Sequence, residues 1–524
     1  MQVKSPSGFR EFGIFVENGG TKKIRMAQEK CLSSGLDTFA FKTPQRFFRF
    51  QENLVSLFVQ RNISYVFDSM LVERAVKAES SKVSIRHPIP WVWHGFFLDS
   101  DILILRISSH LLWKLSNFKK SLQSILKIVK LIKIVFYARS QVSNNYDSEG
   151  IQVWASFSGK GIFSTDDAHG YTFGNWLKTK AVFADKMITF YSINSETQGQ
   201  SANKIDRDLD ISSLKIPTEA RLNFVKDLVR ILTSGIFLAA KGKPEFLSLG
   251  WELAKALLLE NIYSDALPDY VFFSEGDGVI RPLWTYVAEK RNRKVIYIFF
   301  SNCDTPRLPG YASSNFQAFS CASWSHYWCI DEWQVSSLMS RTRLMRSKFE
   351  IMGHPWRSDL ILDLPKDSRT RIAAFDYEAL NGLFGFGTIH DVGYYDQRKE
   401  IEFLSDLVLV AANLEVLILH KPKRNIPIHK RTKEYSELLE KLELHPNYQI
   451  INSEVSPHRL IQESHLVISL PLTSTALIAK SLGKVSLFYD PIGKMEHNDD
   501  SLRGIPLIQS RKLLEEFLRG IILN

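Results

Sequence analysis

The stretch that decides the fold of this chain lies near its C-terminal end and reads HLVISLPLTSTALIAKSLGKVSLFYDP, from His465 to Pro491. Its first apolar run, Leu466 to Leu470, predicts a short buried parallel strand. Leu477 to Leu482 has helical spacing, and Gly483 ends that helix. A second strand follows at Val485 to Tyr489. The stretch is therefore one strand-turn-helix-strand unit of an α/β sheet.

Three consecutive hydroxyl residues, Thr473, Ser474 and Thr475, lie where this helix begins. A helix N-terminus exposes backbone N–H groups and the positive end of the helix dipole, and small hydroxyl side chains add donors without blocking a phosphate. The other interpretation is an ordinary N-cap with spare hydroxyls. Because ligands of open α/β sheets bind at the carboxyl ends of strands, we predict a phosphate site here and include Ser469 in it.

The C-terminal part of the chain alternates between strand and helix patterns. Besides the opening stretch, the predicted elements are Lys348 to Met352, Ile372 to Phe375, Glu402 to Ala412, Leu414 to Leu419, Thr432 to Leu442, Tyr448 to Ile451, Pro457 to Glu463 and Arg511 to Leu518. This rhythm predicts a doubly wound parallel sheet. We assign it to a C-terminal, nucleotide-binding domain of residues 348–524.

Positive side chains follow one of these predicted strands. His420, Lys421 and Arg424 come directly after Leu414 to Leu419, where they would bring positive charge to a pyrophosphate. His354 follows the strand that ends at Met352, and it either joins this phosphate site or caps its own turn.

The N-terminal part, residues 1–335, ends in another strand-helix-strand unit. Asp269 to Phe273 and Lys294 to Phe300 predict strands, and Arg281 to Lys290 predicts the helix between them. We expect this unit to close the sheet of an N-terminal Rossmann-like domain.

Two carboxylates, Glu275 and Asp277, follow the first strand of that unit. A carboxylate within hydrogen-bond reach of a hydroxyl can act as a general base, and both are candidates for that role. The alternative is a glycine-rich turn with solvated acids. Arg281 opens the following helix, where its planar guanidinium could hold a phosphate or carboxylate through two hydrogen bonds.

A basic segment covers residues 101–139. No acidic residue lies between Asp101 and Asp147, whereas eight lysines and arginines do. An apolar helical face is predicted by the spacing of Leu122, Ile125, Val129, Ile132 and Phe136. Two interpretations stay open for 114–139: a helix on an anionic membrane surface, or a core helix with solvated lysines. The polar residues 140–215 predict an irregular insertion.

The composition limits the function classes. The formal charge of +10 suits an anionic partner, and four cysteines without a CxxC pair offer little for zinc. No run resembles a signal peptide or a membrane span, which predicts a cytoplasmic protein, peripheral on the inner face of the plasma membrane if 114–139 binds lipid. Nucleic-acid binding is disfavoured because the basic residues concentrate on an apolar-faced helix.

The sequence Pro471-Leu472-Thr473-Ser474 resembles the Pro-Phe-Thr-Ser motif of a group of bacterial surface-polysaccharide biosynthesis proteins, with Leu472 in place of the usual Phe. Gly278 to Glu289 is similar to the Arg-Pro-Leu-Trp-Thr-Tyr block of the same group. The likeness covers about residues 270 to 510. It implies a GT-B glycosyltransferase fold, in which two Rossmann-like domains face a cleft that holds a nucleotide-sugar.

Residues and resemblance together predict a metal-independent glycosyltransferase that needs no cofactor. It would move a sugar from a nucleotide-sugar to a glycan or lipid-linked acceptor of a capsule, O-antigen or exopolysaccharide. The N-terminal domain would hold the acceptor, and positive groups would stabilise the leaving phosphate in place of a metal ion. A polyol-phosphate transferase, a nucleotide-sugar epimerase and a non-catalytic partner of polysaccharide assembly remain as alternatives.

Overall fold

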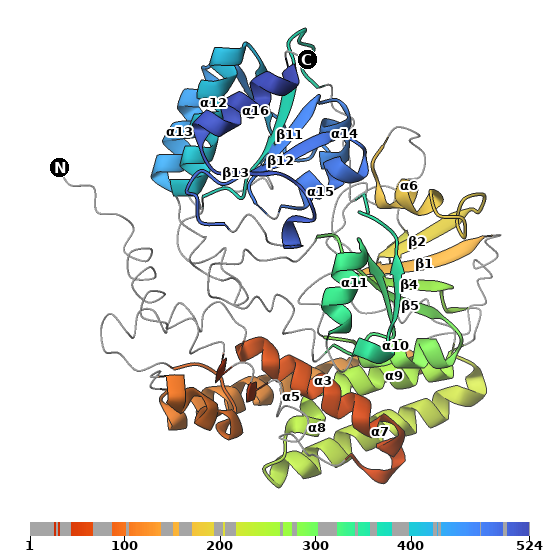
Figure 1. Cartoon of the computed structure of the whole chain (residues 1–524). Helices are drawn as coiled ribbons and strands as arrows, with labels where there is room; N and C mark the ends of the chain where they lie inside the picture. Colours follow the sequence, from red (N-terminus) through yellow and green to blue (C-terminus); the bar gives the residue numbers. More distant parts are fainter. Residues whose placement is uncertain are drawn as a thin grey trace.

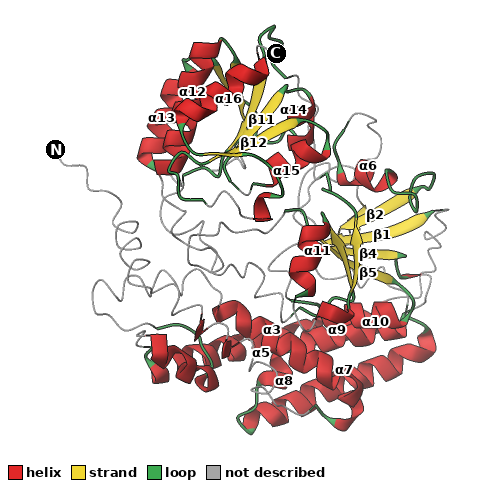
Figure 2. Ribbon diagram, in the orientation of Figure 1, coloured by secondary structure: helices red, strands yellow, loops and turns green. Residues whose placement is uncertain are grey.

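The computed structural model describes residues 26–27, 30–31, 43–66, 86–100, 104–137, 150–156, 170–192, 203–204, 216–262, 266–274, 280–301, 322–340, 344–356, 364–379, 398–422, 427, 431–471, 473–495 and 500–522. Within these ranges the chain forms two parallel β-sheets, each with helices on its faces (Figure 1, Figure 2).

The first sheet has seven strands in the order β3-β2-β1-β4-β5-β6-β7, and all paired neighbours are parallel. The strands are β1 (Ile151–Ser156), β2 (Ile188–Ser192), β3 (Asn203–Lys204), β4 (Tyr270–Phe273), β5 (Lys294–Ile298), β6 (His326–Cys329) and β7 (Lys348–Ile351). The strand order reverses between β1 and β4, as in doubly wound Rossmann sheets. That reversal is a topological switch point, beside which such sheets bind ligands.

Helices cover both faces of this sheet. A thick helical layer lies on one face and consists of η1 (Gln45–Phe50), α3 (Gln51–Val66), η2 (Trp91–Ser100), α5 (Arg106–Tyr137), α7 (Thr218–Ala240), α8 (Glu245–Ser248), α9 (Gly250–Asn261) and α10 (Leu283–Lys290). The other face carries α6 (Phe173–Lys178). Along β4, Val271 and Phe273 belong to the core under the helical layer, whereas Tyr270 and Phe272 pack in the core with Phe173. Burial on both faces explains why the strands are apolar without alternation.

The second sheet has six parallel strands in the order β10-β9-β8-β11-β12-β13. They are β8 (Arg371–Phe375), β9 (Leu417–His420), β10 (Tyr448–Ile450), β11 (Leu466–Ser469), β12 (Val485–Tyr489) and β13 (Leu507–Ile508). One face carries α12 (Arg398–Leu414), α13 (Lys433–Glu443) and α16 (Arg511–Ile522), and the other carries α14 (Pro457–Gln462) and α15 (Ser474–Ser481). The switch point of this sheet lies between β8 and β11.

The predicted fold class, α/β with two Rossmann-like doubly wound domains, is confirmed. Both sheets show the same 3-2-1-4-5-6 strand order, and the first adds β7 at its edge. The strand-helix-strand unit predicted from the opening stretch is β11, α15 and β12.

Three predictions about the first domain are wrong. The strand at Lys348–Ile351 does not begin the second domain, because it pairs with β6 in the first sheet. Residues 140–215 are not merely an irregular insertion, since β1, β2 and β3 lie there and β1 is a central strand. The β4-α10-β5 unit is likewise central instead of closing the sheet. Each of these strands is short and flanked by polar residues. The sequence of such a strand does not determine which neighbouring strand it pairs with.

The predicted basic amphipathic helix is confirmed as α5 (Arg106–Tyr137), and the predicted apolar face is not the side that packs in the core. The buried side chains of α5 include Trp113, Ile128 and Leu131. Of the predicted apolar face, Leu122 and Val129 are exposed. The side chain of Phe136 is outside the described residues.

Candidate functional site

The two domains touch through residues that follow the carboxyl ends of their strands. Tyr171, just before α6, stacks on His458 of α14 with 5.8 Å between ring centroids. Trp356, shortly after β7, lies 4.9 Å from the Tyr171 ring and 6.1 Å from the His458 ring. The hydroxyl of Tyr171 also donates a hydrogen bond to Gln462.

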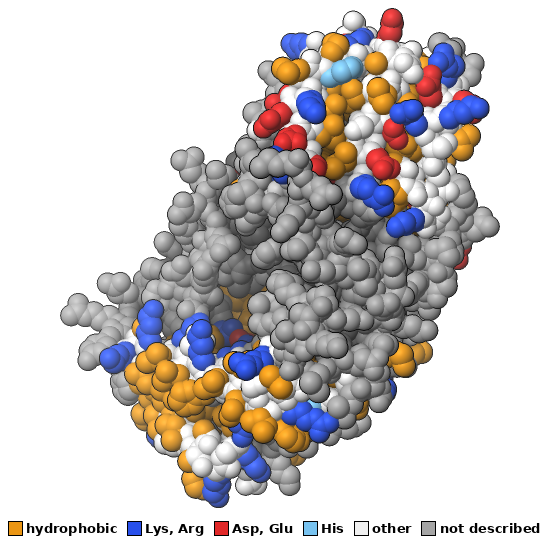
Figure 3. All heavy atoms as spheres, turned by 90° about the vertical axis from the view of Figure 1, so that its left-hand side faces the viewer, with side chains coloured by type: hydrophobic (Ala, Val, Ile, Leu, Met, Phe, Trp, Pro, Cys, Tyr) orange, Lys and Arg blue, Asp and Glu red, His pale blue; other side chains and the backbone are white. Residues whose placement is uncertain are grey.

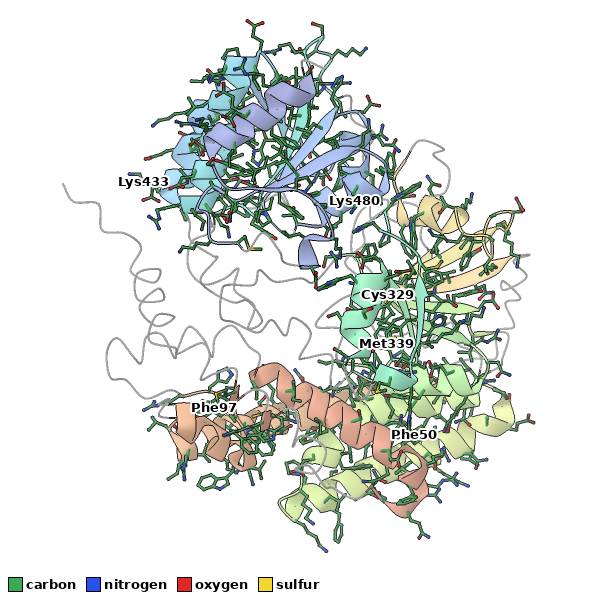
Figure 4. The ribbon with its side chains drawn as sticks, viewed as in Figure 1. Phe50, Phe97, Cys329, Met339, Lys433 and Lys480 are labelled. Carbon is green, nitrogen blue, oxygen red and sulfur yellow. The ribbon has the colours of Figure 1, made fainter. Side chains whose placement is uncertain are left out.

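A second contact joins the domains through Arg503, which follows η9 (Asp500–Leu502) in the second domain. Its Nε lies 3.0 Å from Asp331 Oδ2, and its guanidinium carbon lies 4.4 Å from the ring centroid of Trp333. Asp331 follows β6 and caps α11 (Glu332–Met339). Lys480 of α15, labelled in Figure 4, donates to the backbone carbonyl of Arg503. Both sheets thus present their carboxyl ends to each other, the side on which doubly wound sheets bind ligands.

The predicted phosphate site lies at the start of α15, directly after the switch-point strand β11. The Thr473 hydroxyl donates to the carbonyl of Leu470 at 2.9 Å and accepts from the Thr475 hydroxyl at 3.2 Å. The Ser469 and Thr475 hydroxyl oxygens are 2.9 Å apart. As a result Thr473 makes no side-chain cap bond to the first turn of α15. These hydroxyl bonds stabilise the turn between β11 and α15.

The structure brings Ser469, Thr473 and Thr475 together and places Ser474 beside them as the first residue of α15. Ser469 and Thr473 are buried, whereas Ser474 and Thr475 are partly exposed. Leu472, which replaces the Phe of the motif, is outside the described residues. Ser474 and Thr475 are therefore the side chains of this turn that solvent reaches.

His420 takes part in a buried network instead of presenting a free positive group, which corrects its predicted role. Its Nε2 lies 3.3 Å from Asp376 Oδ1, and its Nδ1 lies 2.6 Å from the hydroxyl of Tyr448. The hydroxyl of Tyr435 donates to the other oxygen of Asp376. Both His420 and Asp376 are buried. The network fixes the carboxyl ends of β8 and β9 but cannot reach a phosphate.

Lys421 is the other positive residue after β9. Its ammonium donates to the carbonyl of Ser453 at 3.0 Å and to that of Pro422 at 3.3 Å. Burial lowers the pKa of Lys421 to about 8, with Glu378 opposing the shift. Lys421 therefore still carries most of its charge at neutral pH. Arg424 lies outside the described residues.

The sequence pattern did not predict two charged residues of this site, Lys399 and Glu400. Both are buried at the start of α12, with 3.2 Å between Lys399 Nζ and Glu400 Oε1. Burial raises the pKa of Glu400 to about 7, Lys399 opposes this, and Asp376 adds to it. The available signal was their position, because they lie on the same face of α12 as the buried Phe403 and Leu407. A carboxyl that titrates near neutrality beside a switch point is a candidate acid or base.

His354 lies at the domain junction, after β7. Burial lowers its pKa to about 3, with smaller contributions from His458 and Arg503. The imidazole is therefore neutral at physiological pH and cannot supply the positive charge predicted for it. It remains available as a neutral hydrogen-bonding group between the domains.

Arg281 is structural, which overturns its predicted role as a phosphate clamp. It is buried, and its Nε donates to Thr285 at 2.9 Å while one terminal nitrogen donates to the Ser323 carbonyl at 2.5 Å. The other terminal nitrogen lies 2.5 Å from Glu289, and the guanidinium carbon lies 3.9 Å from the Tyr286 ring centroid. A guanidinium with all three nitrogens engaged has no edge left for a ligand.

The candidate bases Glu275 and Asp277 lie outside the described residues, and their roles stay predictions. The strand that precedes them, β4, borders the switch point of the first sheet. Arg281 anchors the far end of their loop, since its backbone N–H donates to Gln60. Among the described residues, no group of three or more His, Cys, Asp or Glu side chains is placed to hold a metal ion.

Two Rossmann-like domains that meet at the carboxyl ends of their strands define a GT-B-like α/β protein. The sequence model of the polysaccharide biosynthesis PFTS motif proteins matches residues 228–518, more than half of the chain. The chain belongs to this family. Within the described residues, no helix is both long enough and apolar enough to span a membrane.

Comparison with other proteins adds structural similarities of low identity. Anabaena Alr3699/HepE in complex with UDP-glucose is 10% identical, with 71% of this chain and 90% of that chain covered and a TM-score of 0.35. MurG of Acinetobacter baumannii is 11% identical over 71% and 90%, with a TM-score of 0.31. The UDP-GlcNAc 2-epimerase of Methanocaldococcus jannaschii is 10% identical over 71% and 93%, with a TM-score of 0.33. These values carry no argument about activity. No curated protein matches the chain.

Proposed function

We propose that this protein is a glycosyltransferase of bacterial surface-polysaccharide biosynthesis. It would transfer a sugar from a nucleotide-sugar to a glycan or a lipid-linked acceptor. Membership of the polysaccharide biosynthesis family and the two-domain architecture support this class. The observation that carries the proposal is the start of α15, which lies at a switch point, lacks a side-chain cap and belongs to the family motif.

The donor phosphates would bind at the N-terminus of α15. Backbone N–H groups and the positive helix end favour an anion there, and the partly exposed Ser474 lies beside them. Lys421 follows β9, two strands from β11 in the sheet, or about 10 Å away. Its charge would favour an anion at the same edge and help the phosphate to leave without a metal ion.

The acceptor would bind on the first domain. Glu275 and Asp277 follow β4, the strand that occupies in the first sheet the place that β11 occupies in the second. Because the two sheets face each other with their carboxyl ends, a base in this loop would lie opposite the donor site. Either carboxylate would take the proton of the attacking hydroxyl as the bond between sugar and phosphate breaks.

The test is nucleotide binding, measured by calorimetry with CMP, CDP, UDP, GDP and dTDP, with and without EDTA. Ser474→Pro removes one backbone N–H at the first helical position and suits the conformation there, because Thr473 is already extended with ψ 141°. Ser474→Ala is the matched control that keeps this N–H. We expect one nucleotide to bind regardless of EDTA, and the proline variant to bind at least about tenfold more weakly than the alanine variant.

Absence of binding to all five nucleotides would overturn the donor site. It would favour a non-catalytic partner of polysaccharide assembly. Binding that disappears with EDTA would retain the transferase but reject the metal-independent mechanism.

A further inference from the structure

Helix α5 carries an apolar stripe that faces solvent. Its residues recur at spacings of three and four, and between 38% and 72% of each side chain is exposed: Ile107, Leu111, Leu115, Phe118, Leu122, Leu126 and Val129. We call this set the α5 stripe. It runs for about 33 Å along the helix at 1.5 Å per residue. Isolated exposed apolar residues are ordinary, but a continuous row of seven indicates an interaction surface.

The α5 stripe is not the face by which α5 packs in the domain. The opposite side is buried against α7, α8 and α9, and Asn117, Ser121 and Ser124 are among its residues. Ser121 donates to the carbonyl of Pro244, and Ser124 donates to that of Ser248. The buried side also carries Trp113, Ile128 and Leu131, so α5 has apolar residues on both its buried and its exposed sides. A helix that packs only in a core needs no continuous row of apolar residues on its exposed side.

The charged side chains of α5 itself are all positive, and Glu245 of α8 lies close enough to Lys114 to interact with it electrostatically. The helix contains no Asp or Glu. Helical spacing places exposed Lys114 on one border, exposed Lys119 and Lys130 on the other, and Lys133 at the end of the stripe. Figure 3 shows hydrophobic side chains gathered at the lower end of the molecule and bordered by Lys and Arg.

Elements next to α5 also expose apolar and basic side chains. Helix α7, which packs against α5, exposes Leu222, Val229 and Phe237 together with Lys226. Trp91, half exposed, lies 5.8 Å from His110 near the start of α5. Tryptophan is enriched where a protein meets the interfacial layer of a membrane.

We infer that the α5 stripe docks the protein on an anionic membrane surface. The apolar side chains would enter the headgroup region, and the border lysines would face the phosphates of acidic lipids. A second copy of the chain fits less well, because pairing two α5 stripes would bring the border lysines of both copies together. The inference is independent of the proposed function, since it uses no residue of the phosphate site.

The experiment measures co-flotation of the full chain with vesicles, either of phosphatidylcholine alone or of phosphatidylcholine and phosphatidylglycerol in equal parts. We expect binding to the anionic vesicles to be at least tenfold stronger. The triple variant Leu115→Ser, Phe118→Ser, Leu122→Ser should lose at least tenfold of that binding. Since all three side chains are exposed, its thermal midpoint should stay near that of the parent protein.

A matched control replaces three exposed leucines of the second domain: Leu409→Ser, Leu444→Ser and Leu513→Ser. This variant should bind the anionic vesicles as the parent does. A second variant, Lys119→Gln, Lys130→Gln, Lys133→Gln, should lose the preference for anionic over neutral vesicles. Light scattering on all variants records the oligomeric state.

Three results would overturn the inference. The parent protein would fail to bind anionic vesicles, or the control would lose binding as much as the stripe variant. In the third, the parent protein would be a dimer that does not bind vesicles, and the stripe variant would be a monomer. That result would assign the α5 stripe to contact with a second copy of the chain.

Discussion

The hydroxyl oxygens of Ser469 and Thr475 lie 2.9 Å apart, and this hydrogen bond joins the last residue of β11 to the first turn of α15. Because Thr475 donates its hydroxyl proton to Thr473, it accepts the bond from Ser469, and its side chain links the strand end to the helix start. These two bonds join β11 to α15 at the family motif.

Replacing Thr475 by Val should test this bond. The change removes the bridging hydroxyl and keeps the side-chain shape, and the buried Ser469 hydroxyl then loses a partner. We expect the free energy of unfolding of the second domain to fall by about 1 kcal/mol, measured by urea titration. Thr475→Ser keeps the hydroxyl and should retain most of the stability. Equal stability of Thr475→Val and the parent would show that the bond contributes nothing.

Replacing Arg281 by Lys should separate a structural role from ligand binding. A lysine cannot reproduce the contacts to Thr285, Ser323 and Glu289 at once. We expect a loss of about 1 to 3 kcal/mol in the stability of the first domain, because at least one of these acceptors is left without its donor. The nucleotide dissociation constant should stay unchanged. A variant that folds with full stability but binds nucleotide poorly would support the role of Arg281 in binding phosphate.

The raised pKa of Glu400 predicts a specific dependence of stability on pH. Its folded value of about 7 exceeds its ordinary value of 4.5, so the folded state binds more protons than the unfolded state between these values. Stability contributed by the protonated carboxyl is therefore full below about pH 4.5 and is lost as pH rises to about 7. The loss should reach roughly 3 kcal/mol, and Glu400→Gln should remove it. Unfolding titrations at pH 5 and 7.5 measure the difference, and parallel pH profiles for the two proteins would refute it.

The lowered pKa of Lys421 predicts how nucleotide binding depends on pH. The ammonium loses its proton as pH rises through about 8, and its attraction for phosphate is lost with it. We expect the nucleotide dissociation constant to increase several-fold, up to about tenfold, between pH 7.5 and 9. Lys421→Arg keeps its charge in this range and should show a flat profile. An identical rise in both proteins would place the titrating group elsewhere.

The two segments that suggested the family occupy equivalent places in the two sheets. The Arg-Pro-Leu-Trp-Thr-Tyr block begins α10 after β4, and the Pro-Leu-Thr-Ser segment begins α15 after β11. Each follows the strand on the far side of its switch point. The sequence indicated both segments, but the pairing of strands showed that they correspond. In the first segment, Arg281 donates a hydrogen bond to Thr285 of α10. In the second, the Thr473 hydroxyl donates to the carbonyl of Leu470 and closes a turn.

The errors about the candidate site share one cause. The sequence places His420 and Arg281 at a ligand because of their charge and their position after a strand or before a helix. His420 is buried beside Asp376, which lies 44 residues earlier in the chain. Arg281 pairs with Glu289, which lies 8 residues later. Local pattern cannot show whether a charge is already satisfied by a partner.

The sequence by itself determined the class of the fold and the strand-helix-strand unit at 466–489, because apolar periodicity, helix-ending glycine and turn residues act over a few positions. It also determined that α5 is basic and amphipathic. Only the tertiary structure decided that β7 belongs to the first sheet, that 140–215 supplies its central strand, and which face of α5 is buried. Those outcomes depend on the pairing and packing of segments far apart in the chain, whose energies no single segment contains.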